Sequence, residues 1–154
     1  MSRMTTGLAL TVVLVLGAAA AAYAPYHVAT PPPPAAAQGG NLKEQLKTAI
    51  QHSGFAADGT SMASVQQHLG HALNCLEGTK GKHFNQSWGH VCEGQGNGIL
   101  TDLRGAPDGA SFRAVAEAAD ELALGGMKSK DLNESKVSAK AVGALLKVIW
   151  DNLK

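Results

Sequence analysis

The sequence lacks a surplus of charge of either sign, and this absence excludes two classes of partner. The net charge is +1, and Arg3 alone accounts for it, because all other charged residues lie from Asn41 onward, where the two signs balance. Proteins that bind nucleic acids or anionic lipid surfaces carry clustered Lys and Arg residues. We therefore expect no nucleic-acid partner, and a membrane contact only through the N-terminal segment.

The sequence also lacks the common catalytic and cofactor motifs. No Cys-x-x-Cys or Cys-x-x-Cys-His occurs, which excludes a thioredoxin-like redox centre and covalent c-type haem. Serine-nucleophile and zinc-protease signatures are missing, and the glycine-rich run from Cys92 to Gly98 lacks the Lys-Ser/Thr of a phosphate-binding loop. We interpret Glu77, Glu93 and Asp102 as caps and solvated charges. We therefore predict no catalytic residue and expect a protein that is not an enzyme.

The N-terminal segment is typical of an exported protein. Arg3 precedes an apolar run over residues 7–22, which has the pattern of a secretion signal. Residues 1–24 are therefore predicted to be a signal peptide or a signal anchor. Both outcomes remain open, because the small residues at 20–24 suit a signal peptidase, while residues 7–24 approach the roughly 20 residues that span a bilayer. A periplasmic or extracytoplasmic location follows, with possible anchoring in the inner membrane.

A Pro/Ala-rich spacer is predicted over residues 25–40. It contains four consecutive prolines at 31–34 and ends in a glycine pair. Proline runs favour an extended polyproline II conformation, so this segment is typical of a semi-rigid spacer. An unstructured tail left after signal cleavage is the alternative.

Residues 41–154 are predicted to form one all-α domain, an antiparallel four-helix bundle. Apolar residues recur at helical spacing in four stretches. We expect these helices from Asn41 to Gly54, from Thr60 or Ser61 to Glu77, from Asp108 or Ser111 to the Gly125–Gly126 pair, and from about residue 133 to the C-terminus. A short turn is predicted at 99–103. Between helices two and three, residues 78–98 hold six glycines and are predicted to form a long loop.

One face of the second predicted helix carries the residues with the most chemistry. His68, His71 and Cys75 fall within a sector of about 60°. This sector lies away from the apolar stripe of the helix, so another segment should cover it. The glycine-rich loop is the natural candidate, because it carries Trp88 and the second cysteine, Cys92.

The two cysteines are predicted to form a disulfide, because exported proteins fold in an oxidising compartment. The bond from Cys75 to Cys92 would hold the loop across the histidine face, with Trp88 and Asn74 at the contact. Two alternatives remain open. Both cysteines could instead act as thiolate metal ligands beside a histidine. Alternatively, the disulfide could form while His68, His71, His90 and also His83 bind copper, zinc or non-covalent haem. His27 and His52 are assigned no role.

The pattern His68-x-x-His71-x-x-Asn74-Cys75, followed by Cys92-x-Gly-Gln-Gly-Asn-Gly98, resembles that of small uncharacterised exported bacterial proteins. The resemblance covers residues 68–103 and implies that the His/Cys helix and its loop define the group. It implies no activity. This chain has His90–Val91 where the resemblance leads us to expect Asn-Pro, so His90 is the site residue that transfers least well.

Two functions remain after these exclusions. The first is an exported, non-catalytic binding or accessory module without a cofactor, which acts on a protein partner in the cell envelope. The second is a metal- or haem-binding carrier that uses the face of His68 and His71.

Overall fold

The computed structural model describes residues 41–154, and these residues are all-helical, as predicted. The helices are α1 (Leu42–Asp58), α2 (Met62–Glu77), α3 (Ile99–Asp102), α4 (Gly109–Lys128) and α5 (Leu132–Asn152), with a 3-10 helix, η1, at Gln86–Trp88. Within this part of the chain there is no β-strand. The predicted signal segment (1–24) and the spacer (25–40) lie outside the described residues.

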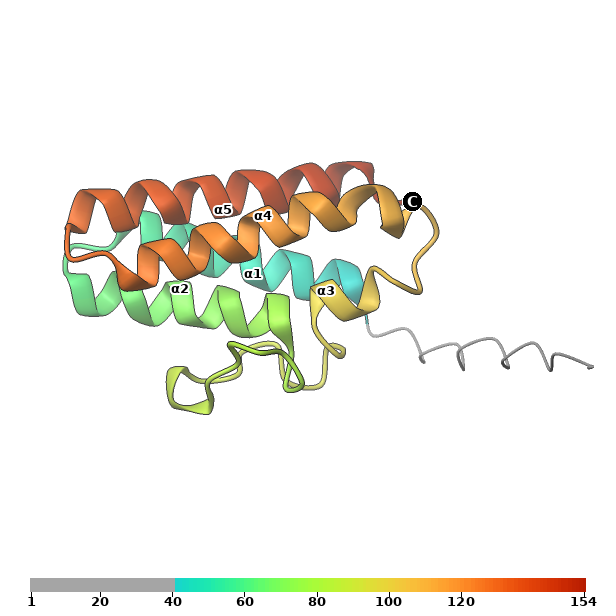
Figure 1. The fold of residues 1–154 in the computed structure, drawn as a ribbon, viewed down its shortest axis with the longest axis horizontal. Helices are drawn as coiled ribbons and strands as arrows, with labels where there is room; N and C mark the ends of the chain where they lie inside the picture. Colours follow the sequence, from blue (N-terminus) through green and yellow to red (C-terminus); the bar gives the residue numbers. More distant parts are fainter. Residues whose placement is uncertain (1–40) are drawn as a thin grey trace, which may run out of the picture. The chain divides into compact units, whose positions relative to one another are not determined.

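The four long helices lie side by side, and each packs against two of the others along its length (Figure 1). α1 packs on α2 and α5, and α4 packs on α2 and α5. The short connections at 59–61 and 129–131 make α1 a neighbour of α2 and α4 a neighbour of α5, as the sequence predicts. The segment after α2 and the short α3 lie along one side of this framework (Figure 1).

The core is aliphatic and comes from all four long helices and α3. It holds no aromatic ring that is fully buried, which agrees with an aromatic content of only 5%. Its largest members, none more than 1% exposed, are Leu46, Leu69, Leu73, Leu76, Ile99, Leu103, Leu146 and Ile149. Small residues fill the remaining contacts, so the helices approach closely along alanine-lined faces.

The first predicted helix boundary is wrong, because α1 continues past Gly54 to Asp58. Gly54 is not in a left-handed conformation, and a Cβ there would meet no atom within 4 Å. The fully buried Ala56 draws the following turn into the core and continues the helix. The helix ends instead before Gly59, where a Cβ would lie 2.7 Å from Val65.

The third predicted helix also runs further than expected, through the Gly125–Gly126 pair to Lys128. Gly126 serves close packing and does not end the helix, because a Cβ there would lie 2.8 Å from Leu69 and 2.9 Å from Ser138. Ser135 of α5 fixes this contact by donating a hydrogen bond to the carbonyl of Gly126 at 2.9 Å. At the other end Asp108 precedes the helix with a φ of 58°, but its side chain makes no capping hydrogen bond.

No helix among the described residues is both long and apolar enough to cross a membrane.

Candidate metal centre

The segment after α2 is tied to that helix at two neighbouring positions. Cys75 and Cys92 form a disulfide, as predicted, and there is no free cysteine. At the preceding residue of α2, the fully buried Asn74 side chain makes three hydrogen bonds to the segment. Its Nδ2 donates to the carbonyls of Asn85 at 2.8 Å and Gly89 at 2.7 Å, and its Oδ1 accepts from the backbone N–H of Asn85 at 2.9 Å.

Trp88 packs on α2 beside the histidine face. Its side chain lies directly on Gly70, where a Cβ would be 2.7 Å from the indole Cγ. The absence of a side chain at Gly70 therefore lets the indole approach the helix backbone. Residues 69–78 are all buried.

Three histidines meet beside this contact, and one of them is His52 of α1, to which the sequence assigned no role. The Nδ1 atom of His52 lies 3.2 Å from Nδ1 of His68 and 3.1 Å from Nδ1 of His71. One ring nitrogen from each of the three residues lies within 4.8 Å of the others. His68 and His71 share a face because they are one turn apart on α2, whereas His52 joins them only through the packing of α1 on α2. We call these three residues the histidine cluster.

His71 is held so that its Nδ1 atom faces the cluster. Its imidazole donates a hydrogen bond to the backbone carbonyl of Trp88. Since Nδ1 faces His52, Nε2 is the donating atom, and it is also the ring nitrogen that points to Gly89, where a Cβ would lie 3.0 Å from it. With hydrogen on Nε2, the lone pair of Nδ1 faces Nδ1 of His52 at 3.1 Å and accepts a hydrogen bond from it in the metal-free protein. Metal-binding histidines commonly have such a second partner.

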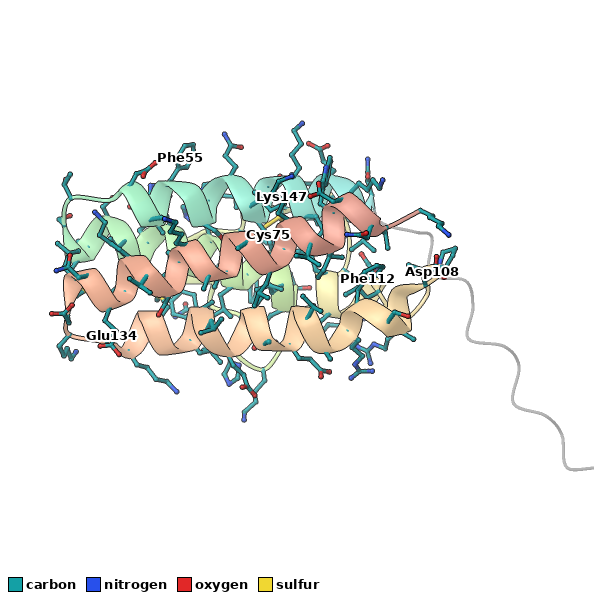
Figure 2. All side chains as sticks on the ribbon, turned by 90° about the horizontal axis from the view of Figure 1, so that it is seen from above. Phe55, Cys75, Asp108, Phe112, Glu134 and Lys147 are labelled. Carbon is teal, nitrogen blue, oxygen red and sulfur yellow. A yellow bond between two sulfur atoms is a disulfide. The ribbon has the colours of Figure 1, made fainter. Side chains whose placement is uncertain are left out.

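The cluster lies at the edge of the protein rather than in the core. His71 is 9% exposed, whereas His52 and His68 are half-buried. Phe55 flanks the exposed side, with its ring centroid 5.5 Å from that of His52 and 5.3 Å from that of His68. Figure 2 shows Phe55 projecting from α1 away from the other helices. An ion from solvent therefore has a short path to the three Nδ1 atoms.

Burial favours the uncharged form of His52 and of His71. Burial, followed by the neighbouring His71 and His68, lowers the pKa of His52 from 6.5 to about 4. Burial also lowers the pKa of His71, against the hydrogen bond to Trp88, which raises it. Metals bind neutral imidazole, so the lowered pKa values of His52 and His71 favour coordination over protonation at neutral pH.

The prediction that the loop covers both histidines of α2 describes His71 better than His68. His71 contacts Trp88 and Gly89, whereas the recorded ring contacts of His68 are to His52, Phe55 and His71. His90 does not belong to the histidine cluster. Its ring packs edge-on against Phe84, with centroids 5.1 Å apart.

Two acidic residues interpreted as solvated charges are in fact 8% exposed. Asp102 accepts hydrogen bonds from the side chains of Gln45 and Asn97 and from the backbone of Asn97, which ties the end of the segment to α1. Glu77 lies with His83 and Asp120 in a second group of potential ligands. Burial, and then the charge of Glu77, raise the pKa of Asp120 to about 7. Glu93 is exposed, as interpreted.

Comparisons of the chain with protein-family models, with curated proteins and with solved structures find no significant match. The functional argument therefore depends on the geometry of these residues alone.

Proposed function

We propose that this chain is an exported, non-catalytic metal-binding protein that holds one copper or zinc ion through Nδ1 of His52, His68 and His71. One observation carries the proposal: three imidazole nitrogens converge on one point, and the most buried imidazole is oriented by a backbone carbonyl. Of the two functions that the sequence leaves open, this observation favours the carrier that uses the histidine face, with His52 in place of His90.

The spacing of the nitrogens suits a tetrahedral ion. Zinc–nitrogen bonds of about 2.0–2.1 Å separate neighbouring ligand atoms by about 3.3 Å in a tetrahedron. The two separations from His52, 3.2 and 3.1 Å, are close to this value before any ion is bound. Three protein ligands leave the fourth position to water or to a ligand from a partner, and the exposed side next to Phe55 is where such a ligand would enter.

The donor set selects among ions. Three neutral imidazoles without a carboxylate suit copper and zinc and disfavour the hard ions magnesium and calcium. Haem is the weaker alternative, because a bis-histidine haem lies between its axial ligands. The Nδ1 atoms of this cluster are already in contact with one another.

The surrounding frame fits a protein that works outside the cytoplasm. We infer that the four long helices form an antiparallel bundle and that residues 78–98 act as a glycine-rich loop pinned onto it. The disulfide requires an oxidising compartment, which supports the proposed extracytoplasmic location. In this setting the chain would carry the ion to, or hold it against, a protein partner in the cell envelope.

Zinc and copper titrations of metal-free protein test the proposal. We expect one ion per chain at the histidine cluster, and His52→Ala should weaken its binding by at least about tenfold because one of three ligands is removed. His90→Ala is the matched control, since it also removes an imidazole next to the loop, but one outside the cluster. Equal affinity of His52→Ala and the natural sequence would overturn the proposal, as would loss of binding in His90→Ala alone.

A further inference from the structure

A second group of titratable side chains lies at the C-terminal end of α2, where Glu77, His83 and Asp120 come together from three segments. Glu77 is the last residue of α2, His83 follows in the loop, and Asp120 belongs to α4. Nδ1 of His83 lies 2.8 Å from Oε1 of Glu77 and 4.0 Å from Oδ2 of Asp120. One ligand atom from each residue lies within 4.8 Å of the others.

The path of the chain between Glu77 and His83 is built around this contact. The backbone turns directly after α2, with the N–H of Gly81 donating to the carbonyl of Gly78 at 2.9 Å. Gly81 then lies against Glu77, where a Cβ would collide with both the side chain and the backbone of that residue. The lack of a side chain at Gly81 is therefore what allows His83 to reach back over Glu77.

One oxygen of the Asp120 carboxylate lacks a hydrogen-bond partner in the described part of the chain. The residue is 8% exposed, and its Oδ1 is fully buried without a hydrogen-bond partner among the described residues. Glu77 is equally buried, so two carboxylates share a site that excludes most water. Among residues 41–154, neither Lys nor Arg pairs with either carboxylate, and His83 is the only basic group in contact with them. Buried carboxylates without enough donors are costly, and they are normally paired or bound to a metal.

We propose that Glu77, His83 and Asp120 form a second metal site, which takes a divalent first-row cation that accepts mixed oxygen and nitrogen ligands, such as Mn²⁺. Two carboxylates and one imidazole match the ligand preference of such an ion. The cation neutralises the two carboxylates and supplies the missing partner of Asp120. His83, whose side chain is 33% exposed, lies on the solvent side through which the ion enters.

This site shares no residue with the histidine cluster and does not depend on it. The two sites also differ in chemistry, since one offers three imidazoles and the other two carboxylates and one imidazole. Mn²⁺ is a useful probe because it binds nitrogen-only sites weakly among the first-row ions. His68→Gln, which removes one ligand of the histidine cluster, provides a background in which the second site is tested alone.

The experiment is a titration of Mn²⁺ into metal-free protein, in which bound ion is measured as the loss of the free-ion EPR signal. In the His68→Gln background we expect one Mn²⁺ per chain. Asp120→Asn and His83→Gln should each weaken this binding by at least about tenfold. Asp120→Asn keeps the shape of the side chain and removes its charge, so it tests coordination rather than folding. Glu121→Gln is the matched control, because it makes the same charge change at the exposed neighbouring position on α4.

The result that overturns the proposal is specific. Absence of Mn²⁺ binding by folded His68→Gln protein, with folding checked by circular dichroism, rules out the second site. Equal affinity of Asp120→Asn and Glu121→Gln does so too. If His68→Gln does not fold, the same variants are compared in the natural sequence. There Asp120→Asn should remove one bound Mn²⁺ per chain, and its failure to do so rules out the second site. Loss of zinc binding in His52→Ala leaves these outcomes unaffected, so each proposal can fail alone.

Discussion

Gly70 controls how closely the loop approaches the histidine cluster. A Cβ at this position would lie 2.7 to 2.9 Å from three atoms of Trp88. Gly70→Ala should therefore push Trp88 outward and destabilise the protein by about 1–2 kcal/mol, because overpacking exceeds the gain in helix propensity. Urea unfolding measures the change. Gly125→Ala is the control: it lies in α4 with no atom within 4 Å, so we expect it to stabilise by up to about 1 kcal/mol. A neutral or stabilising Gly70→Ala would contradict the contact.

His52 makes the stability of the metal-free protein depend on pH. Its folded pKa of about 4 lies below the unfolded value of 6.5. The unfolded chain therefore takes up this proton first, and the contribution to stability is complete above pH 6.5 and declines as the pH falls towards 4. Denaturant unfolding at several pH values should show a shallower decline in His52→Ala than in His90→Ala. The opposite slope that the raised pKa of Asp120 produces is common to both variants and cancels in the comparison. Parallel profiles would show that the folded protein does not keep His52 uncharged.

Individual residues show clearly what the sequence could predict. His71 and Cys75 could be placed on one face because both lie on one helix, whose geometry follows from periodicity. Pairing of Cys75 with Cys92 could be predicted because only two cysteines exist. His52 could not be assigned, because its position depends on the register in which α1 packs against α2, and no local pattern encodes this register. His90 was close in sequence to the loop contact, but its ring turns to Phe84.

At the scale of elements, the helices could be predicted from apolar spacing and caps, whereas glycine-marked ends could not. Ser61 caps α2 as predicted, accepting a hydrogen bond from the N–H of Ser64 at 3.3 Å. Gly54 and Gly126 signal helix ends in a sequence, yet both lie inside helices. Tertiary packing continues both helices past these glycines. At Gly126 the missing side chain permits the approach of Leu69 and Ser138. The sequence contains no information on the difference between an ending glycine and a packing glycine.

Asn74 holds the loop on α2 independently of the disulfide. Asn74→Ala removes three hydrogen bonds and leaves the half-buried N–H of Asn85 and carbonyl of Gly89 without their partner, so we expect a loss of about 2–3 kcal/mol in unfolding free energy. Urea unfolding of the oxidised protein is the measurement. Asn152→Ala is the control, because that side chain makes one exposed hydrogen bond at the end of α5. If Asn74→Ala changes stability no more than Asn152→Ala, the disulfide alone positions the loop.

At the scale of the whole molecule, the histidine cluster joins three parts of the chain that are separate in sequence. α1 contributes His52, α2 contributes His68 and His71, and the loop orients His71 through Trp88. An all-α fold follows from helical periodicity alone, but a site formed by three segments requires their packing. An ion bound at this point would connect α1 to α2 close to the position where the disulfide connects α2 to the loop.

NMR of the imidazole nitrogens tests the central claim most directly, because it identifies the atoms that bind the ion. In ¹⁵N-labelled protein loaded with one equivalent of ¹¹³Cd²⁺ as a spin-active substitute for zinc, we predict cadmium–nitrogen couplings to Nδ1 of His52, His68 and His71. The Nε2 atom of His71 should keep its hydrogen, because it donates to Trp88. Couplings to Nε2 atoms, to His90, or to His68 and His71 without His52 would contradict the account.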